Sequence, residues 1–292
     1  MKSRLYLPKL ESPPRTILEY LAACFPHIPE VEWQDRVRRG QVHLADGTVL
    51  MEDAPYTHGV TLHYSRHVAQ EPEPDEEPAI VFQDENILVA DKPHGMVVTP
   101  AGNHFSRSLL VRLERCTGLD GLAPLHRLDR DTAGLVLFAV RAEVRHSYQR
   151  LFQAREIQRE YSCIASLTQP PLQRESRVCN RMESGEPWFR RRIAENSGGE
   201  PNAITNIELQ ESGARHALFR LRPETGKKHQ LRVHMASLGF PIVGDTMYPE
   251  IREAQASDPP LQLLAARFSF NDPLSGEPRS FTSMRQLLWP ME

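Results

Sequence analysis

The sequence predicts an α+β protein in which a small module precedes a larger domain built on a mostly antiparallel sheet. Short β-rich runs recur through the last two-thirds of the chain, and stretches of helical period separate only some of them. An acidic, proline-rich stretch interrupts the chain before these runs begin. With 292 residues the chain is long enough for one large and one small domain. We divide it into a small module at 1–68, a linker at 69–78 and the larger domain at 79–292.

The small module shows two helix patterns followed by a hairpin pattern. Apolar residues at helical spacing predict one helix from Thr16 to Phe25 and a second from Val31 to Arg39. The run 41–44, the turn signal Asp-Gly at 46–47 and the run 48–50 predict a short hairpin. Basic side chains gather at the end of the second helix: Arg36, Arg38 and Arg39.

The linker is predicted from its composition. The segment 71–78, Glu-Pro-Glu-Pro-Asp-Glu-Glu-Pro, has no apolar side chain to bury, and its prolines favour an extended chain.

The larger domain alternates between β-rich runs and two amphipathic helix patterns. Apolar and β-branched residues predict strands at 79–82, 87–90, 135–140, 161–165, 204–209 and 217–221. A helix is predicted between Arg141 and Arg155, and another from Thr225, as its cap, to Gly239. Strands that outnumber the helices to this extent favour an antiparallel sheet.

Composition excludes several classes of protein. No apolar run approaches the roughly 20 residues that span a bilayer, and the polar N-terminus lacks a signal-peptide core, so we expect a cytoplasmic protein without membrane attachment. The four cysteines form no C-x-x-C pair, which argues against disulfides and thiolate zinc sites. A net charge of -3 argues against non-specific coating of nucleic acid but permits a local basic groove. Since no heptad pattern is present, we expect a monomer.

The densest group of charged side chains is the loop 125–134, Leu-His-Arg-Leu-Asp-Arg-Asp-Thr-Ala-Gly, directly before an apolar strand. Loops at the end of a strand often carry chemistry. A calcium loop built on Asp129 and Asp131 fails, because Ala133 and Val140 occupy its fifth and twelfth positions. Two interpretations of the residues stay open: a salt-bridged surface turn, and a catalytic carboxylate flanked by arginines.

A second group lies on the predicted helix after residue 225. Lys228 and Arg232 share one helical face, and Lys227 precedes them. His229 and His234 are five residues apart, which is a poor spacing for two metal ligands on one face, so we expect no metal site.

Four segments in one order resemble the RluA-type pseudouridine synthase family. They are Asp-Lys-Pro-His-Gly-Met at 91–96, His-Arg-Leu-Asp with Thr-Ala-Gly at 126–134, Arg-Glu-Tyr-Ser-Cys-Ile-Ala at 159–165, and Thr-Gly-Lys-Lys-His-Gln-Leu-Arg-Val-His-Met at 225–235, followed by Leu-Gly-Phe-Pro-Ile-Val-Gly-Asp at 238–245. The resemblance covers about 80–281. The small module resembles, more loosely, the S4-type RNA-binding module.

The resemblance implies an enzyme that isomerises a uridine of a structured RNA, ribosomal or transfer, to pseudouridine without a cofactor. Asp129 would be the catalytic carboxylate, Tyr161 would stack on the target base, and Arg232 would lie beside Asp129 and keep it ionised. The extruded uridine would be replaced by Arg127. The other RNA- and substrate-contacting residues would be His126, Thr132, Lys227, Lys228, Leu231, Arg36, Arg38 and Arg39.

Three positions depart from the family pattern. Lys227 stands where arginine is usual, which keeps the charge but loses the bidentate fork. Ala133 replaces the usual serine of the loop, and Ala265-Ala266 lacks a histidine common in the family. A catalytically inactive RNA-binding or ribosome-assembly factor on the same fold is the alternative function. A metal-dependent hydrolase that uses the aspartates and histidines is a second alternative.

Overall fold

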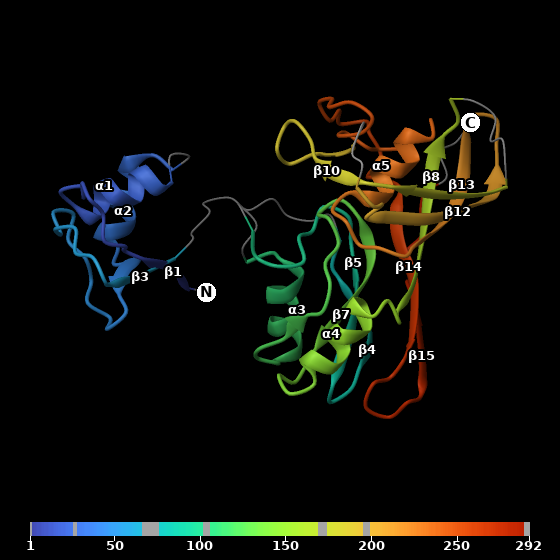
Figure 1. Cartoon of the computed structure of the whole chain (residues 1–292). Helices are drawn as coiled ribbons and strands as arrows, with labels where there is room; N and C mark the ends of the chain where they lie inside the picture. The colour runs from blue at the N-terminus through green and yellow to red at the C-terminus, as the bar shows by residue number, and fades with distance from the viewer. Residues whose placement is uncertain are drawn as a thin grey trace. The chain divides into compact units, whose positions relative to one another are not determined.

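The computed structural model describes residues 2–25, 28–65, 76–101, 106–168, 174–194 and 199–288. The chain divides into two compact units, Met1–Gln70 and Glu71–Glu292, which we call the N-terminal unit and the large unit (Figure 1). Most of the linker predicted at 69–78 lies outside the described residues. Its end is described: Glu76 and Glu77 form ion pairs with Arg285 and Arg112 of the large unit.

The N-terminal unit packs two helices on a three-stranded antiparallel sheet. The sheet has the order β1 (Lys2–Tyr6), β3 (Thr61–Ser65), β2 (Val42–Leu44), and the helices are α1 (Ile17–Cys24) and α2 (Glu30–Arg38). A capping box starts α1, because the Thr16 hydroxyl accepts from the Glu19 N–H and the Glu19 carboxylate accepts from the Thr16 N–H. Both predicted helices are confirmed to within a residue at each end.

The predicted hairpin is wrong in its second strand. The turn at Gly47 forms, but the run 48–50 contributes only a single bridge between Val49 and His43. β2 pairs instead with β3, whose Leu62 and Tyr64 are buried in the helix-packed core, whereas Val49 is 54% exposed. The strand with two core side chains therefore takes the central place in the sheet.

The large unit is organised on one sheet. Its strands follow the order β4 (Ala79–Gln83), β5 (Ile87–Lys92), β7 (Ala133–Ala139), β14 (Leu263–Asn271), β8 (Gln158–Ser166), β13 (His216–Pro223), β12 (Ala203–Ser212), β9 (Glu175–Asn180), with β15 (Pro278–Thr282) on β14 and β6 (Ala123–Pro124) on β7. A separate hairpin joins β10 (Met182–Ser184) to β11 (Arg191–Ile193). All pairs are antiparallel except β7 with β14, so the predicted α+β class is confirmed.

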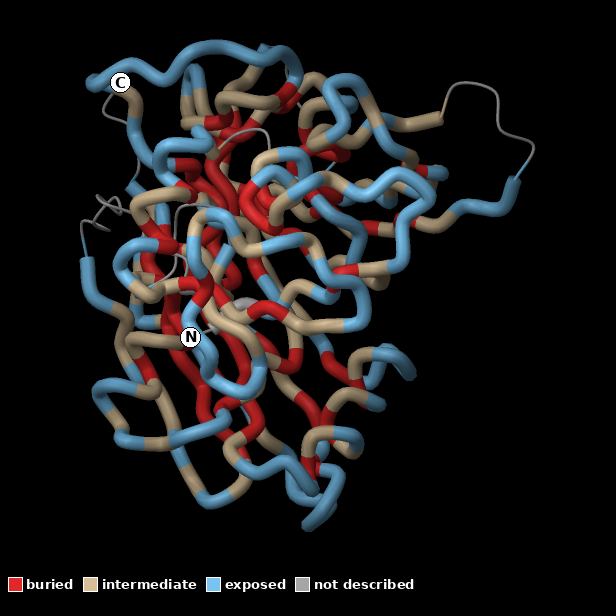
Figure 2. Tube along the Cα trace, turned by 90° about the vertical axis from the view of Figure 1, so that its left-hand side faces the viewer, coloured by how far each residue is buried: buried red, intermediate tan, exposed pale blue. Residues whose placement is uncertain are grey.

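Strands β5 and β7 are buried on both faces, which explains why their sequences are continuously apolar. One face packs on α4 (Arg145–Gln153), where Val89 and Leu137 lie in the cluster that contains Tyr148. The other face packs on α3 (Leu109–Thr117), where Leu88 and Phe138 lie in the cluster of Leu113. Figure 2 shows the buried chain (red) running along the strands and the exposed chain in the loops.

Glycine at position 134 makes the parallel pairing of β7 with β14 possible. A Cβ at Gly134 would lie 2.3 Å from the Ala265 carbonyl oxygen, and φ there is +110°. Gly134 pairs with Ala265, which pairs in turn with Tyr161 on β8. This pairing therefore brings the end of the 125–134 loop close to Tyr161.

The predicted strands of the large unit and the helix predicted between Arg141 and Arg155 are confirmed, whereas α3 was not predicted. The helix α5 (Gln230–Ser237) begins later than predicted, because Thr225 does not cap it: its hydroxyl donates to Gln230 Oε1 (2.8 Å) and accepts from the Ile204 N–H (2.9 Å). His229 is the N-cap residue instead. Among the described residues, no helix has the length and apolar character needed to cross a membrane.

Candidate active site

Asp129 lies in the loop between β6 and β7, at the mouth of the central strands. Its side chain is 31% exposed. Its carbonyl oxygen accepts from the backbone N–H of Thr132 (3.2 Å), and Thr132 is 97% buried. The turn thus holds the carboxylate at a fixed place that a ligand can reach.

The buried ammonium of Lys92 anchors this loop from beneath. Lys92 Nζ donates to the carbonyl oxygens of Pro93 (2.9 Å), Met96 (2.8 Å) and Arg130 (2.9 Å), and the side chain is fully buried. Burial lowers the pKa of Lys92 to about 7, while the charges of Asp131 and Asp129 raise it. Three carbonyl acceptors require three N–H donors, which only the protonated amine supplies.

The loop also contains the surface ion pair that the sequence allowed for. Arg130 Nε donates to Asp131 Oδ1 (2.8 Å), and His94 Nδ1 donates to the Asp131 carbonyl oxygen (2.7 Å). Asp129 is placed differently, since its Oδ1 lies 3.9 Å from Nε2 of His229 and none of the ion pairs among the described residues joins it to an arginine. Within one loop, therefore, one carboxylate is neutralised by an arginine while the other faces the interior of the site.

Tyr161 lies on β8 where two apolar clusters meet. The ring packs against both the Leu128 cluster and the Leu231 cluster, which places it between the two halves of the sheet. Burial raises the pKa of Tyr161, the charge of Arg159 lowers it, and Asp129 raises it. The phenol therefore stays protonated at neutral pH and lies within electrostatic range of the carboxylate.

His229 faces Asp129 from the start of α5. The residue has φ of 58°, an uncommon backbone conformation for a non-glycine residue, and it is 8% exposed. Its Nδ1 lies 2.9 Å from the hydroxyl of Tyr248, and that hydroxyl already accepts from the Arg191 N–H (2.8 Å). Burial lowers the pKa of His229 to about 4, against the charge of Asp129, so the ring is neutral at pH 7.

The tautomer of His229 follows from this network. The buried Tyr248 hydroxyl needs an acceptor for its proton, and His229 Nδ1 is the acceptor at hydrogen-bond distance. The imidazole proton then sits on Nε2, the nitrogen that lies 3.9 Å from Asp129 Oδ1. This N–H points toward the carboxylate but is too far away for a direct hydrogen bond.

Arg232 is paired with an aspartate that the sequence analysis did not single out. Its Nε and Nη2 donate to Asp245 at 2.8 and 2.6 Å, and the two side chains are 3% and 1% exposed. The guanidinium also lies over the Tyr248 ring, 5.4 Å from its centroid. Burial acts to lower the pKa of Arg232, but Asp245, then Asp129 and Asp131, raise it overall. Arg232 thus lies within electrostatic range of the Asp129 charge, with no ion pair between the two side chains among the described contacts.

The His126 side chain makes its contacts within the fold. Its Nε2 accepts from the Leu137 N–H (3.1 Å), and its ring centroid lies 4.9 Å from that of Phe152. Burial lowers its pKa to about 3, with Arg159 adding to the effect. The prediction that His126 contacts RNA gains no support from this placement.

Some of the other predicted RNA-contacting residues are exposed, and others are buried in the core or form ion pairs within the fold. Arg127, Lys227 and Lys228 are exposed, whereas Leu231 is 7% exposed and belongs to the core. In the N-terminal unit, Arg36 is buried against Trp33 and pairs with Glu32. Arg38 and Arg39 are largely exposed and pair with Glu52 and Asp35.

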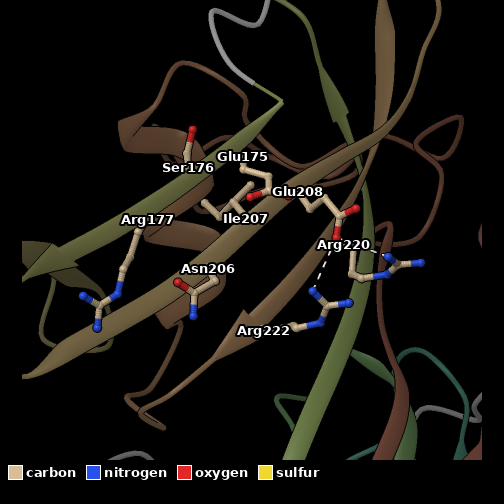
Figure 3. Close-up of a pocket in the computed structure, with 8 residues that line it drawn as sticks. All are labelled: Glu175, Ser176, Arg177, Asn206, Ile207, Glu208, Arg220 and Arg222. Carbon is tan, nitrogen blue, oxygen red and sulfur yellow. Dashed lines mark hydrogen bonds and ion pairs between the residues drawn. The ribbon is translucent and has the colours of Figure 1, made fainter.

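A hollow of about 340 Å³ on the described surface lies away from Asp129. In it Arg220 and Arg222 share the Glu208 carboxylate (Figure 3). Arg220 pairs with Ser162 on β8, the neighbour of Tyr161, so the hollow occupies the opposite face of the sheet. Its cations are already neutralised, which makes it a poor candidate for the site. In the described parts of the chain, no three His, Cys, Asp or Glu side chains converge to hold a metal ion.

Four residues of the site were not predicted to belong to it: Lys92, His229, Asp245 and Tyr248. Lys92, His229 and Asp245 lie inside the segments that resemble the family, so their positions carried a signal. Tyr248 follows in a segment without periodicity. Only the folding of the chain after α5 back onto this helix brings Asp245 to Arg232 and Tyr248 to His229.

Comparisons with known proteins agree with the motifs. A family model described as RNA pseudouridylate synthase matches residues 86–237, just over half of the chain. An uncharacterised RNA pseudouridine synthase of Synechocystis is 29% identical over 234 residues, which cover 80% of this chain and 79% of that protein. The ribosomal large subunit pseudouridine synthase D of Pasteurella multocida is 29% identical over 235 residues, covering 78% and 71% of the two chains.

A solved structure has the same fold. The human RNA pseudouridylate synthase domain containing 1 superposes with a TM-score of 0.60 at 23% identity, over 74% of this chain and 86% of that chain. The matched region contains Asp129, Tyr161 and Arg232. The chain therefore belongs to the RNA pseudouridylate synthase family, and it is an RNA-modifying isomerase.

Proposed function

We propose that the large unit converts a uridine of structured RNA to pseudouridine and that Asp129 is its catalytic carboxylate. The observation that carries the proposal is that the charge of Asp129 acts on both Tyr161 and Arg232, which come from two distant segments of the chain. A reachable carboxylate beside a partly buried aromatic ring and a buried cation suits a reaction on a flat, uncharged base.

The reaction requires no second substrate. The bond from N1 of the base to C1′ breaks, the uracil turns over, and C5 bonds to C1′, while the proton lost from C5 is balanced by one gained at N1. Three opening steps are compatible with one ionised carboxylate: addition to the sugar, addition to the base, or removal of a sugar proton. Each of them needs Asp129 in its ionised form.

The surroundings assign roles to the neighbouring residues. The Tyr161 ring would stack on the uracil and keep it in the site after the glycosidic bond breaks. Arg232, held by Asp245, would keep a buried positive charge close to Asp129. His229 would direct its Nε2 proton toward the same carboxylate or toward a substrate oxygen beside it.

RNA binding would require extrusion of the target nucleotide. Unstacking costs a few kcal/mol, and Arg127, exposed two residues before Asp129, is placed to fill the space that the base leaves. Lys227 and Lys228 would contact phosphates near the start of α5. Since several relatives are named as synthases of the ribosomal large subunit, we propose ribosomal RNA as the first substrate to test.

The N-terminal unit would add affinity for RNA as an S4-like module through Arg38 and Arg39. We also propose that the protein acts as a monomer in the cytoplasm, where bacterial ribosomal RNA is made. Light scattering of the purified full chain tests the oligomeric state.

The test compares the wild type with Asp129→Asn on total RNA from a strain that lacks the gene. EDTA is present throughout, and pseudouridine is mapped by reverse-transcription stops after carbodiimide treatment. The expected result is a stop with the wild type and none with the variant. Asp131→Asn is the matched control, because it removes a carboxylate of the same loop that is already paired with Arg130.

Each contrary outcome has its own meaning. Equal stops from the wild type and Asp129→Asn would remove Asp129 from catalysis. RNA binding without stops from either protein would support the inactive binding factor. RNA cleavage that appears only when EDTA is left out, with no stops under either condition, would support the metal-dependent hydrolase.

A further inference from the structure

The hairpin β10–β11 presents an aromatic side chain that the fold does not bury. Trp188 is 82% exposed, the highest value for a large apolar side chain among the described residues. It lies in the turn between the two strands, and Phe189 supports it edge-on with the ring centroids 5.9 Å apart. Exposing an indole to this degree leaves a large apolar area in water, and burial in a complex would recover that cost.

The turn that carries Trp188 is held in place. The Gly185 N–H donates to the Arg190 carbonyl oxygen (3.1 Å), and the Arg190 N–H donates to the Pro187 carbonyl oxygen (2.8 Å). Two more contacts attach the hairpin to the site: the Arg190 guanidinium lies over the Tyr248 ring at 4.9 Å and donates to the Pro249 carbonyl oxygen at 2.6 Å. The indole is therefore presented by a fixed element.

A continuous set of contacts connects this hairpin to the carboxylate. The Arg191 N–H donates to the Tyr248 hydroxyl, that hydroxyl contacts His229 Nδ1, and His229 Nε2 faces Asp129. Lys228, the residue next to His229, has its Nζ 6.0 Å from the centroid of the Trp188 ring. Trp188 thus lies beside the entrance to the site.

Basic side chains outnumber acidic ones around the indole, since three arginines of the hairpin and two lysines at the start of α5 stand against Glu183 and Glu186. Lys227 and Lys228 are exposed at the start of α5, and neither is in an ion pair with another described residue. Arg191 is bonded to the uncharged Ser184, while Arg192 is paired with Glu183. An exposed aromatic face with lysines beside it fits a nucleic-acid base and the phosphates next to it.

We propose that Trp188 is a stacking platform for an unpaired base of the RNA substrate, next to the extruded uridine, and that Lys228 binds the adjoining phosphate. This inference rests on the proposed function, because it places the base within the RNA that Asp129 acts on. A base flanking an extruded nucleotide has lost a stacking partner, and the indole replaces that partner.

The first experiment measures kinetics of the full chain on unmodified large-subunit ribosomal RNA transcribed in vitro. Trp188→Ala is expected to raise KM by about 5- to 150-fold, the range for loss of one base–aromatic stack, with kcat nearly unchanged. Trp188→Phe, which keeps a ring, is expected to recover most of the loss. Leu274→Ala is the matched control, because it removes a 50% exposed apolar side chain from the β14–β15 turn of the same unit.

The second experiment measures tryptophan fluorescence with a single-stranded oligouridylate of about ten nucleotides as the probe. Stacking on a base quenches indole emission, so the wild type is quenched and Trp188→Phe loses most of that quenching. A purely structural role for Trp188 would leave no such signal.

The outcomes separate the two proposals. If the wild type forms pseudouridine and Trp188→Ala keeps its KM, the stacking inference is wrong and the proposed function stands. If the wild type forms none, the proposed function fails, and quenching by oligouridylate alone decides the inference. Unchanged KM on naked RNA with a loss only on protein-containing ribosomal particles would assign Trp188 to a protein contact and overturn the inference.

Discussion

The ion pair between Arg232 and Asp245 offers a sharp test of how the site is held. In Asp245→Asn, the Oδ1 atom can still accept from the backbone N–H groups of Met247 (2.8 Å) and Tyr248 (3.0 Å), so the local turn is kept. The amide Nδ2, however, would face the guanidinium and leave a buried cation without its counter-charge. Breaking one partner of a buried pair costs about 3–5 kcal/mol of unfolding free energy.

The expected change in melting temperature follows from the size of the large unit. For a unit of this size each kcal/mol lowers Tm by about 2–4 °C. Asp245→Asn should therefore melt roughly 6–20 °C below the wild type. The matched control is Arg222→Met, which removes a half-exposed arginine from the pairs with Glu160 and Glu208 and should change stability by less than about 1 kcal/mol.

A double-mutant cycle completes the assay, with urea unfolding measured for Asp245→Asn, Arg232→Met and the two together. The double variant should be more stable than the sum of the single losses predicts, by about 2 kcal/mol, because it leaves no unpaired charge. All three should form pseudouridine more slowly than the wild type, since each removes or misplaces the Arg232 cation. Additive losses, or a single loss no larger than that of Arg222→Met, would refute the reasoning.

Three further predictions concern the loop, the sheet and acid stability. Lys92→Met should lower the free energy of unfolding by about 3 kcal/mol, because three carbonyl groups lose their donor; urea unfolding measures this loss. The same variant should lower kcat on the order of 100-fold, because the loop bearing Asp129 loses its anchor; steady-state kinetics measures this effect. Gly134→Ala should cost more than about 4 kcal/mol or prevent folding, whereas Gly121→Ala, also at positive φ but with open space for a Cβ, should cost about 1 kcal/mol, as measured by thermal melting. Burial lowers the pKa values of His126, His229 and His234 to about 3, 4 and 4, so the unfolded chain binds more protons than the folded chain below pH 6.5. Their contribution to stability is therefore present above pH 6.5 and is lost as the pH falls toward 4. His234→Gln should reduce the slope of unfolding free energy against pH near pH 5 by about 1.4 kcal/mol per pH unit, and an unchanged slope would contradict the lowered pKa of His234.

Periodicity predicted the elements whose burial is regular. Strands β5 and β7 are apolar without interruption because α3 and α4 cover both faces, and a continuous apolar run is easy to detect. The strand β14 was not predicted, since Arg267 and Ser269 interrupt its apolar run and two of its three neighbours, β7 and β8, come from distant parts of the chain. In the N-terminal unit, the strand that pairs with β2 begins at Thr61, 13 residues after the start of the predicted hairpin partner at Thr48.

The start of α5 shows how a local rule can be overridden. Thr225 fits the sequence preference for an N-cap, yet its hydroxyl is used by Ile204 and Gln230, and the helix begins five residues later. The intervening chain places His229 at positive φ with its ring toward Asp129. Sequence preferences could not foresee this, because the competing partner Ile204 lies on another strand.

By itself, the sequence determined the chemistry that the site contains: a carboxylate in a charged loop, a tyrosine on a strand and an arginine on a helix, in the order that a known family shares. Only the tertiary structure decided which groups meet. It paired Arg232 with Asp245, placed Lys92 beneath the loop, and joined the Trp188 hairpin to His229 through Tyr248. These partners are chosen by burial, because a charge or hydroxyl removed from water must find a partner wherever the folded chain supplies one, at any distance along the sequence.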